Sequence, residues 1–315
     1  MALLAIDIGA TKLCMGIFDE QGKLLVKEKF FRDGRQGKEA GDSIVARFKE
    51  WSQKQEYGTL RATGVCVPGI YRIRTGTVWA PNIPGWEDYP LLEALNAVSD
   101  GIPVSIDSDR ACYILGETWQ GNTKNCNDAI YLAVGTGIGA GIITEGRVLR
   151  GAHDIAGAIG WLALKPPFTE KYCQCGCFEE YASGEGLLKT ALEILDEDKT
   201  IVSELRKISR EKLTTADIFN ALNKKDGVAV QAIQTGITYW GMAAANLVSL
   251  FNPEKIIFGG GVFGPAIPLI PQIREEATKW AQPISMQQVQ FESSALGTDA
   301  GLYGAAHLAL KNLHP

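Results

Sequence analysis

Twice in this chain an apolar strand leads into a turn of glycine and threonine and then into a returning strand. The first copy runs through ALLAIDIGATKLCMGIF near the start, and the second is DAIYLAVGTGIGAGIITEGRVL at residues 128–149. Two such units predict two related lobes with a cleft between them. The length agrees with this, because 315 residues are too many for one average domain.

Strands and helices alternate through the rest of the sequence. Apolar residues at Ile44, Phe48 and Trp51 have the spacing of an amphipathic helix. The strand PVSIDSD precedes a helical pattern at residues 110–121, and a long apolar helix is expected at 230–251. The strand KIIFG follows it, and a last helix is expected at 298–313. This alternation predicts an α/β protein.

The composition excludes several classes of function. The formal net charge is −5 and no stretch concentrates lysine or arginine, so we expect no nucleic-acid partner. No apolar run reaches about 18 residues and no signal peptide is recognisable, so we expect no membrane partner. Four of the seven cysteines lie singly among apolar residues (Cys14, Cys66, Cys112, Cys126). Reduced thiols of this kind predict a cytoplasmic protein.

Three glycine-rich turns each follow an apolar strand: DIGATK at residues 7–12, GTGIGAG at 135–141 and FGGGVFG at 258–264. Any one of them could be a tight hairpin turn, since a lone glycine pattern is a weak signal. Glycine also lets backbone N–H groups approach an anion closely, and a threonine hydroxyl adds a donor. Three such turns favour a nucleotide. The second turn leads into a strand rather than a helix, which argues against a dinucleotide site, and the Walker pattern is absent.

With these motifs in this order, the whole chain resembles the ROK family of sugar kinases, members of the actin-like, hexokinase-type ATPase superfamily. PNIPGW at residues 81–86 resembles the family's sugar-side loop, and CQCGCFEEYASG at 173–184 resembles its cysteine signature. The resemblance implies a two-lobed actin-like (ribonuclease H-like) ATPase fold with an interdomain cleft, and a homodimer. The smaller lobe would comprise residues 1–117 and 296–315, and the larger lobe residues 118–295.

The resemblance also implies how the chain would bind ATP and Mg²⁺. Asp7 would hold Mg²⁺, through water, beside the transferring phosphate. The remaining nucleotide contacts would come from the three glycine turns. They are Gly9, Ala10, Thr11 and Lys12 in the first turn, Gly135, Thr136 and Gly137 in the second, and Gly260 and Gly261 in the third.

Asp109 stands at the family's catalytic aspartate, counted back from Gly116-Glu117. A carboxylate there can accept the proton of a sugar hydroxyl as its oxygen attacks the γ-phosphate. Asp107 is the poorer candidate, because it would point to the opposite face of a continuing strand. Asp109 could equally be the N-cap of the helix after it, and both roles can hold at once. On the sugar side, Gly69 and Asn82 would contact hydroxyls of the substrate.

The sequence departs from the family on the sugar side. Ser108 stands where the family has asparagine, and Ala158 and Trp161 replace a sugar-binding glutamate and a histidine that also binds zinc. Trp161 offers an apolar surface with a single N–H donor. Glu179 remains where the family has another sugar-binding carboxylate, although it could be a surface residue. These changes should alter which sugars are accepted.

Zinc binding stays open. Cys173, Cys175 and Cys177 could supply three thiolates, but structural zinc needs four ligands and Trp161 cannot donate one. The alternative is a turn of reduced thiols that binds no metal. We therefore assign none of its residues as a metal ligand.

The leading hypothesis is an ATP-dependent kinase acting on a hydroxyl of a hexose or related sugar. A ROK transcriptional repressor would need an N-terminal helix-turn-helix, and the first strand begins at about Leu3, so we expect none. A catalytically silent sugar-sensing or scaffold protein of the same fold is the remaining alternative, because the sugar motif is altered while the phosphate turns and Asp109 are present.

Overall fold

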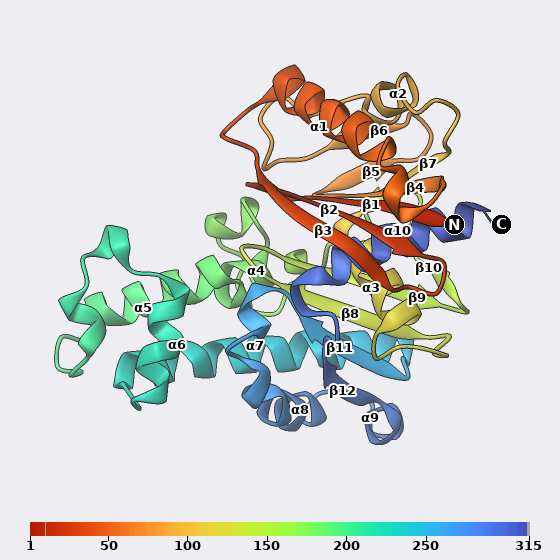
Figure 1. Ribbon diagram of the computed structural model, residues 1–315. Helices are drawn as coiled ribbons and strands as arrows, with labels where there is room; N and C mark the ends of the chain where they lie inside the picture. Colours follow the sequence, from red (N-terminus) through yellow and green to blue (C-terminus); the bar gives the residue numbers. More distant parts are fainter. Residues whose placement is uncertain (10, 314–315) are drawn as a thin grey trace. The chain divides into compact units, whose positions relative to one another are not determined.

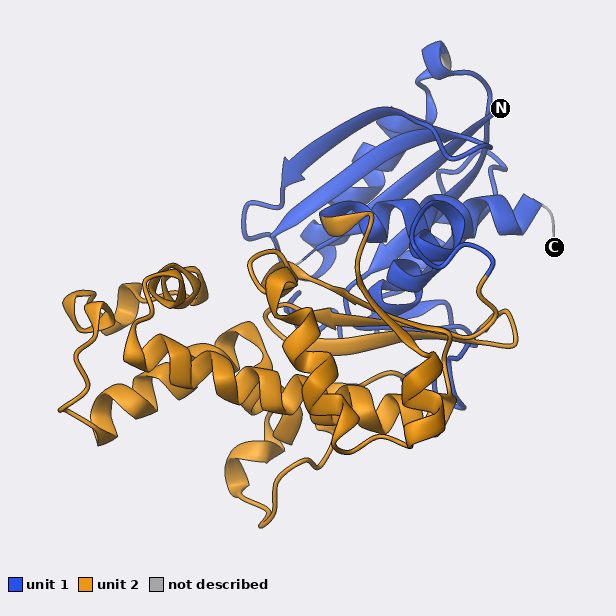
Figure 2. Cartoon of the chain, turned by 90° about the horizontal axis from the view of Figure 1, so that it is seen from below, with its two compact units in different colours: residues 1–125, 148–156, 298–315 blue, residues 126–147, 157–297 orange. Residues whose placement is uncertain are grey.

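The computed structural model describes residues 1–9 and 11–313 (Figure 1). The chain divides into two compact units. Unit 1 contains residues 1–125, 148–156 and 298–315, and unit 2 contains residues 126–147 and 157–297 (Figure 2). Each unit is described by itself below.

Unit 1 is built on a five-stranded sheet with the strand order β3-β2-β1-β4-β7. Its strands are β1 (Ala2–Ile8), β2 (Lys12–Asp19), β3 (Leu24–Phe31), β4 (Leu60–Val67) and β7 (Val104–Ser108). The first three strands are antiparallel, and β1, β4 and β7 run parallel. A small hairpin of β5 (Ile70–Arg72) and β6 (Thr77–Trp79) follows β4.

Helices cover both faces of this sheet. They are α1 (Gly37–Ser52), α2 (Leu91–Asn96), α3 (Asp109–Gln120) and α10 (Ala300–Leu313), with a 3₁₀ turn, η1, at Gln55–Tyr57. Successive residues of β1 point to opposite faces. Leu4 and Ile6 therefore join the core under α1, and Leu3 and Ala5 join the core under α3 and α10. Figure 1 shows α1 on one side of the sheet and α10 on the other.

α10 lies unusually close to its neighbours in unit 1. A Cβ on Gly304 would come within 1.8 Å of the Cys112 carbonyl oxygen in α3, and one on Gly64 within 1.8 Å of the Ala305 carbonyl oxygen. No side chain fits at either position, so only glycine permits this packing.

Unit 2 repeats the arrangement with the strand order β10-β9-β8-β11-β12. Its strands are β8 (Ala129–Val134), β9 (Ile138–Thr144), β10 (Arg147–Val148), β11 (Lys255–Gly259) and β12 (Gln290–Ser293). β8 and β9 are antiparallel, whereas β8, β11 and β12 run parallel. The two sheets thus share one topology, as the repeated sequence unit predicts.

The longest helix of unit 2, α7, is apolar over much of its surface, and several other helices of this unit pack against it. The α-helices are α4 (Cys177–Ala182), α5 (Gly184–Glu197), α6 (Thr215–Asn223), α7 (Gly227–Phe251), α8 (Ile270–Thr278) and α9 (Pro283–Gln288). The 3₁₀ turns are η2 (Ile159–Trp161), η3 (Glu170–Cys173), η4 (Glu204–Lys207), η5 (Arg210–Lys212), η6 (Gly261–Phe263) and η7 (Ile267–Leu269), with η8 (Gly297–Asp299) at the boundary to unit 1. As the sequence predicts, Asn252 terminates α7: it is the C-cap after Phe251 and is in the left-handed conformation (φ 44°).

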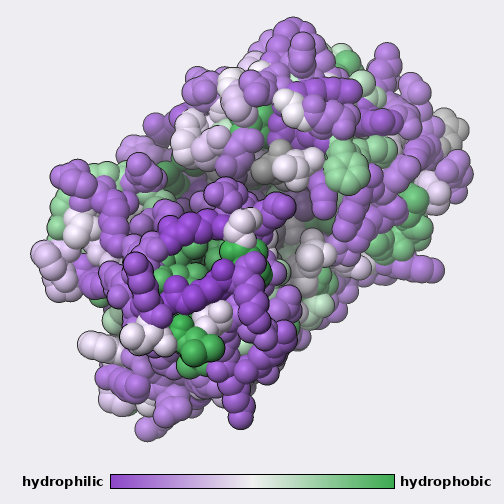
Figure 3. Space-filling view, turned by 90° about the vertical axis from the view of Figure 1, so that its left-hand side faces the viewer, coloured by the Kyte–Doolittle hydropathy of each residue, from purple (hydrophilic) through white to green (hydrophobic). Residues whose placement is uncertain are grey.

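The expected α/β class is confirmed, because each unit combines a five-stranded sheet with packed helices. Polar side chains cover most of the face in Figure 3, with apolar ones visible in a hollow and in smaller patches elsewhere. Among the helices of residues 1–9 and 11–313, none is long and apolar enough to cross a membrane.

Candidate active site

The first glycine turn joins β1 to β2 in unit 1. The Gly9 N–H donates to the Lys12 carbonyl oxygen at 2.8 Å, while the side chains of Thr11 and Lys12 are exposed. Ala10 lies outside the described residues. Arg32, a residue that sequence reasoning missed, directly follows β3 and supports this turn. Its Nη1 donates to the Gly9 carbonyl oxygen at 3.2 Å, and its backbone N–H donates to the Thr11 carbonyl oxygen at 3.0 Å.

Asp7 precedes this turn and points to the face of the sheet that α3 and α10 cover. Burial raises the pKa of its carboxyl to about 6; a hydrogen bond from Cys66 lowers it, and the charges of Asp109 and Asp299 raise it. Gly301, in the first turn of α10, has no side chain, and a Cβ there would come within 2.9 Å of Asp7 Oδ2. Burial and like charge both disfavour the charged form of Asp7, and a cation bound beside it would favour that form.

Asp109 is the first residue of α3, and Ser108 is its N-cap. The Ser108 hydroxyl accepts the Ala111 N–H at 3.3 Å, so the alternative that Asp109 caps this helix is wrong. Asp109 Oδ1 accepts the N–H of the next residue, Arg110, at 2.8 Å. Within residues 1–9 and 11–313, no side chain donates a hydrogen bond to this carboxylate. Burial raises its pKa to about 6, and the Arg110 charge opposes that rise.

Asp107 differs from Asp109 because its carboxylate is already paired. It is buried at the end of β7, forms an ion pair with Arg150 and accepts the Ser108 N–H at 2.8 Å. Burial raises its pKa, and Arg150 lowers it. A carboxylate committed to an arginine is a poor proton acceptor for a hydroxyl, which agrees with the sequence-based preference for Asp109.

The guanidinium of Arg110 lies between two loops beside Asp109. Its Nη2 donates to the Gly69 carbonyl oxygen at 3.3 Å and its Nη1 to that of Ile155 at 3.5 Å. Gly69 has a φ of 100°, and a Cβ there would come within 2.2 Å of the Trp79 carbonyl oxygen. The sequence-predicted sugar residue Gly69 is therefore tied to the residue next to the predicted base. Asn82, in the following loop, is exposed.

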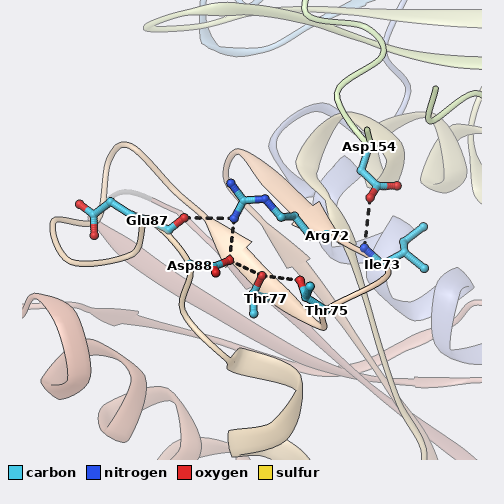
Figure 4. A network of polar contacts seen from close by, with 7 residues as sticks. All are labelled: Arg72, Ile73, Thr75, Thr77, Glu87, Asp88 and Asp154. Atoms are coloured by element: carbon cyan, nitrogen blue, oxygen red, sulfur yellow. Dashed lines mark hydrogen bonds and ion pairs between the residues drawn. The ribbon is translucent and has the colours of Figure 1, made fainter. Parts of the chain in front are cut away.

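A polar network fixes the hairpin of β5 and β6 beside these residues (Figure 4). Asp88 accepts from Arg72 Nη1 at 2.7 Å and from the Thr77 hydroxyl at 2.5 Å. Asp154, from the 148–156 segment, accepts the Ile73 N–H at 3.2 Å. The loop after the hairpin is held by Trp86, which is buried and stacks on Tyr89 with 4.5 Å between ring centroids.

Glu179 supports the second glycine turn, which joins β8 to β9 in unit 2. Glu179 Oε2 accepts the Ile138 N–H at 2.6 Å, and a Cβ on Gly137 would come within 2.9 Å of the same oxygen. The Gly184 N–H donates to the Gly135 carbonyl oxygen at 2.8 Å. Glu179 is thus half-buried and hydrogen-bonded to the turn, unlike a freely exposed surface residue. Thr136 is exposed at the tip of the turn.

The third glycine turn adjoins the second within unit 2. Gly260 has a φ of 87°, and a Cβ there would come within 2.4 Å of the Val134 carbonyl oxygen, directly before Gly135. Gly261 opens η6 and is exposed. The nucleotide residues predicted in unit 2 thus gather at one edge of its sheet.

The structure divides the sequence-predicted residues between the units. Unit 1 contains Asp7, Gly9, Thr11, Lys12, Gly69, Asn82, Ser108 and Asp109, and unit 2 contains Gly135, Thr136, Gly137, Trp161, Glu179, Gly260 and Gly261. Trp161, on η2, is 57 % exposed.

The cysteine turn does not fit a zinc ion. Within residues 1–9 and 11–313, no group of three or more His, Cys, Asp or Glu is arranged to hold a metal. Cys173 is exposed, Cys175 half-buried and Cys177 buried, and all three thiols are free. Burial and the neighbouring Glu180 raise the pKa of Cys175 to about 11, which opposes the thiolate form that binds metal.

Known proteins resemble the chain along its length. The model of the ROK family matches residues 3–312. A glucokinase of Halalkalibacterium halodurans is 30% identical over 97% of this chain and 94% of its own length. A ROK family glucokinase from Streptomyces griseus, solved with glucose and AMPPNP, is 29% identical with a TM-score of 0.81, over 99% of this chain and 100% of that one. A putative xylose repressor of a Caldicellulosiruptor species is 32% identical over 79% of this chain and 62% of its own length.

Proposed function

This chain belongs to the ROK family, and we propose that it is an ATP-dependent kinase that transfers a phosphoryl group to a hydroxyl of a hexose or related sugar. The kinases among its relatives support the class of reaction, and one of them was solved with glucose and an ATP analogue.

The state of the Asp109 carboxylate carries this proposal. A general base needs a carboxylate that is not neutralised by a cation and whose pKa is near the working pH. Asp109 forms no ion pair within residues 1–9 and 11–313 and has a pKa of about 6, although the Arg110 charge lowers that pKa, whereas Asp107 is ion-paired with Arg150. Asp109 would accept the hydroxyl proton as the sugar oxygen attacks the γ-phosphorus, and the bond from that phosphorus to the oxygen of the leaving ADP would break.

Other residues of the chain would bind and orient the reactants. The backbone N–H groups of the three glycine turns would bind the phosphates and the adenosine. Bound Mg²⁺ would neutralise charge on the phosphates, and Asp7 would hold it. Arg110 would fix the position of Gly69 relative to Asp109 on the sugar side, because its guanidinium donates to the Gly69 carbonyl oxygen.

A second candidate function is sugar sensing without catalysis. Two observations favour it: Ala158 and Trp161 stand where the family has sugar-binding side chains, and one relative is a putative repressor. Such a protein would bind a sugar but would not consume ATP.

A turnover screen separates the two functions. The purified protein is incubated with ATP, Mg²⁺ and a panel of hexoses, amino sugars, polyols and glycosides, and ADP release is measured with Asp109→Asn as the blank. We expect sugar-dependent ADP release with at least one compound. Tight sugar binding by calorimetry without turnover of any compound would favour the sensor and overturn the kinase.

A further inference from the structure

The cysteine turn of unit 2 is bonded to side chains of its own unit. Cys175 Sγ donates to Glu180 Oε2 at 3.5 Å, and Cys173 Sγ donates to Glu170 Oε2 at 3.8 Å. Cys177 is buried at the start of α4. The three thiols therefore lie in three different surroundings, although their spacing places them within one turn.

The turn is next to an ion pair between the buried carboxylate of Glu180 and the exposed ammonium group of Lys189. Glu180 is buried, and its Oε2 accepts from Lys189 Nζ of α5 at 2.7 Å as well as from Cys175. The side chain of Glu180 is 8% exposed, so its charge is largely removed from water. Lys189 supplies the compensating charge that a buried carboxylate requires.

Three tyrosines and two lysines form a second cluster next to the turn. Tyr181 of α4 stacks on Tyr239 of α7 with 4.7 Å between ring centroids, and its hydroxyl lies 3.2 Å from that of Tyr172. The ammonium groups of Lys165 and Lys171 lie 4.7 and 4.6 Å from the centroid of the Tyr181 ring. Cations at this distance are attracted to an aromatic ring.

The turn is in contact with the residues that hold the second glycine turn. Gly176 has a φ of 87°, and a Cβ there would come within 2.5 Å of Trp161 Cα. A Cβ on Gly160 would come within 2.9 Å of Glu179 Oε2, the oxygen that accepts the Ile138 N–H. The cysteine turn, η2 and the Glu179 carboxylate are therefore packed closely together within unit 2.

We propose that the turn Cys173–Cys177 is held without a metal, by the Glu180–Lys189 ion pair and the tyrosines around it, and that Lys189 is a positioning residue. Through Glu180 it fixes α4, and α4 places the Glu179 carboxylate under Ile138. The arrangement is a property of unit 2 and does not depend on the substrate of the protein.

The first test measures metal. The full chain is expressed with added zinc, separated from free metal by gel filtration and analysed for zinc by mass spectrometry. We expect far less than stoichiometric zinc, and the same Tm with and without EDTA. Stoichiometric zinc whose removal lowers the Tm would overturn the proposal.

The second test compares two lysine–glutamate pairs of unit 2. Lys189→Met leaves the buried Glu180 unpaired, whereas Lys224→Met breaks an equally short pair with Glu204 at 2.7 Å in which both side chains are exposed. We expect the Tm to fall by at least about 3 °C for Lys189→Met and hardly to change for Lys224→Met.

The positioning role of Lys189 is tested by a separate measurement, the rate of hydrogen exchange at the Ile138 amide. Exchange should become at least about tenfold faster in Lys189→Met, because a weaker hold on α4 loosens the Glu179–Ile138 bond. Lys189→Arg, which keeps the charge, should restore the wild-type rate, and Lys224→Met should not change it. Equal effects of the two methionine variants would overturn the role of Lys189.

Discussion

Gly301 leaves open the space next to the Asp7 carboxylate, where a Cβ would come within 2.9 Å of Oδ2 and 3.1 Å of Oδ1. The glycine belongs to the last helix, α10, and Asp7 to the first strand, so the fold itself creates room around this carboxylate.

Gly301→Ala should displace the carboxylate. A methyl group at that distance is closer than real Cβ contacts come, and Asp7 must turn away from the position proposed for Mg²⁺ binding. We expect kcat/KM to fall by at least about tenfold, with the apparent affinity for Mg²⁺ weakened, because a misplaced group loses transition-state binding. Steady-state kinetics over a Mg²⁺ titration measure this. Wild-type kinetics in this variant would contradict the placement of Mg²⁺ at Asp7.

Asp109→Asn should remove phosphoryl transfer and leave nucleotide binding intact. The amide has nearly the shape of the carboxylate but cannot accept a proton, and a general base typically contributes about 10²–10⁴-fold. We expect kcat to fall within that range and the Kd for ATP, measured by calorimetry, to stay within about threefold. Retention of the wild-type kcat would show that Asp109 is not the base.

Asp7→Asn should stabilise the protein at neutral pH. The pKa of Asp7 is raised from 3.8 to about 6, so its folded form binds the proton more tightly than the unfolded chain does. A raised carboxyl pKa contributes stability below about pH 4, and this contribution is lost as the pH rises through about 6. In EDTA, we expect the variant to exceed the wild type in free energy of unfolding by about 1–3 kcal/mol at pH 7.5 and to match it at pH 4. Urea titrations at both pH values measure the difference, and a variant less stable at pH 7.5 would refute it.

Glu179→Ala should loosen the second glycine turn. The variant removes the acceptor of the Ile138 N–H, and that amide should exchange with solvent at least about tenfold faster. Glu179→Gln keeps an oxygen acceptor, so its exchange should stay close to that of the wild type. Hydrogen-exchange mass spectrometry resolves the peptide, and equal protection in wild type and alanine variant would show that this bond does not hold the turn.

Arg150→Met should destabilise unit 1 more than Arg72→Met. Both arginines pair with an aspartate, but the Asp107 side chain is 7% exposed and the Asp88 side chain 66% exposed. Removing Arg150 leaves the buried Asp107 carboxylate without a compensating charge, because among residues 1–9 and 11–313 only the Ser108 N–H still bonds to it. We expect a loss of about 2 kcal/mol for Arg150→Met and less than about 1 kcal/mol for Arg72→Met. Denaturant titrations compare them, and similar losses would mean that solvent reaches Asp107.

The sequence predicts the periodic parts of this fold well, because periodicity reports on local structure. The hairpin of β1 and β2, its counterpart β8 and β9, and the helices α3, α7 and α10 all occur where apolar spacing and glycine turns indicate. In contrast, the sequence alone does not identify which residue is the N-cap of α3. Ser108 and Asp109 are both good caps, and only the backbone geometry assigns that role to Ser108.

Several side chains around the candidate site could not be predicted from the sequence. Arg32, Arg110 and Arg150 bond to partners 23, 41 and 43 residues away. Nothing in the neighbouring sequence marks an arginine as the partner of a distant carbonyl or carboxylate, because these contacts depend on strand order. The hydrogen bond of Glu179 to Ile138 is of the same kind, and it links the cysteine signature to the second glycine turn.

The position of α10 in the chain has a consequence for biosynthesis. β1 is the first strand to be made and α10 the last helix, yet α10 covers one face of the sheet that contains β1. Until Gly301 and the residues after it have been synthesised, Leu3 and Ala5 lack the part of their core that α10 supplies, and Gly301 is not yet beside Asp7. Unit 1 therefore completes its core only after unit 2 has been translated, and a ribosome-stalled chain that ends before residue 298 should expose that face to chaperones.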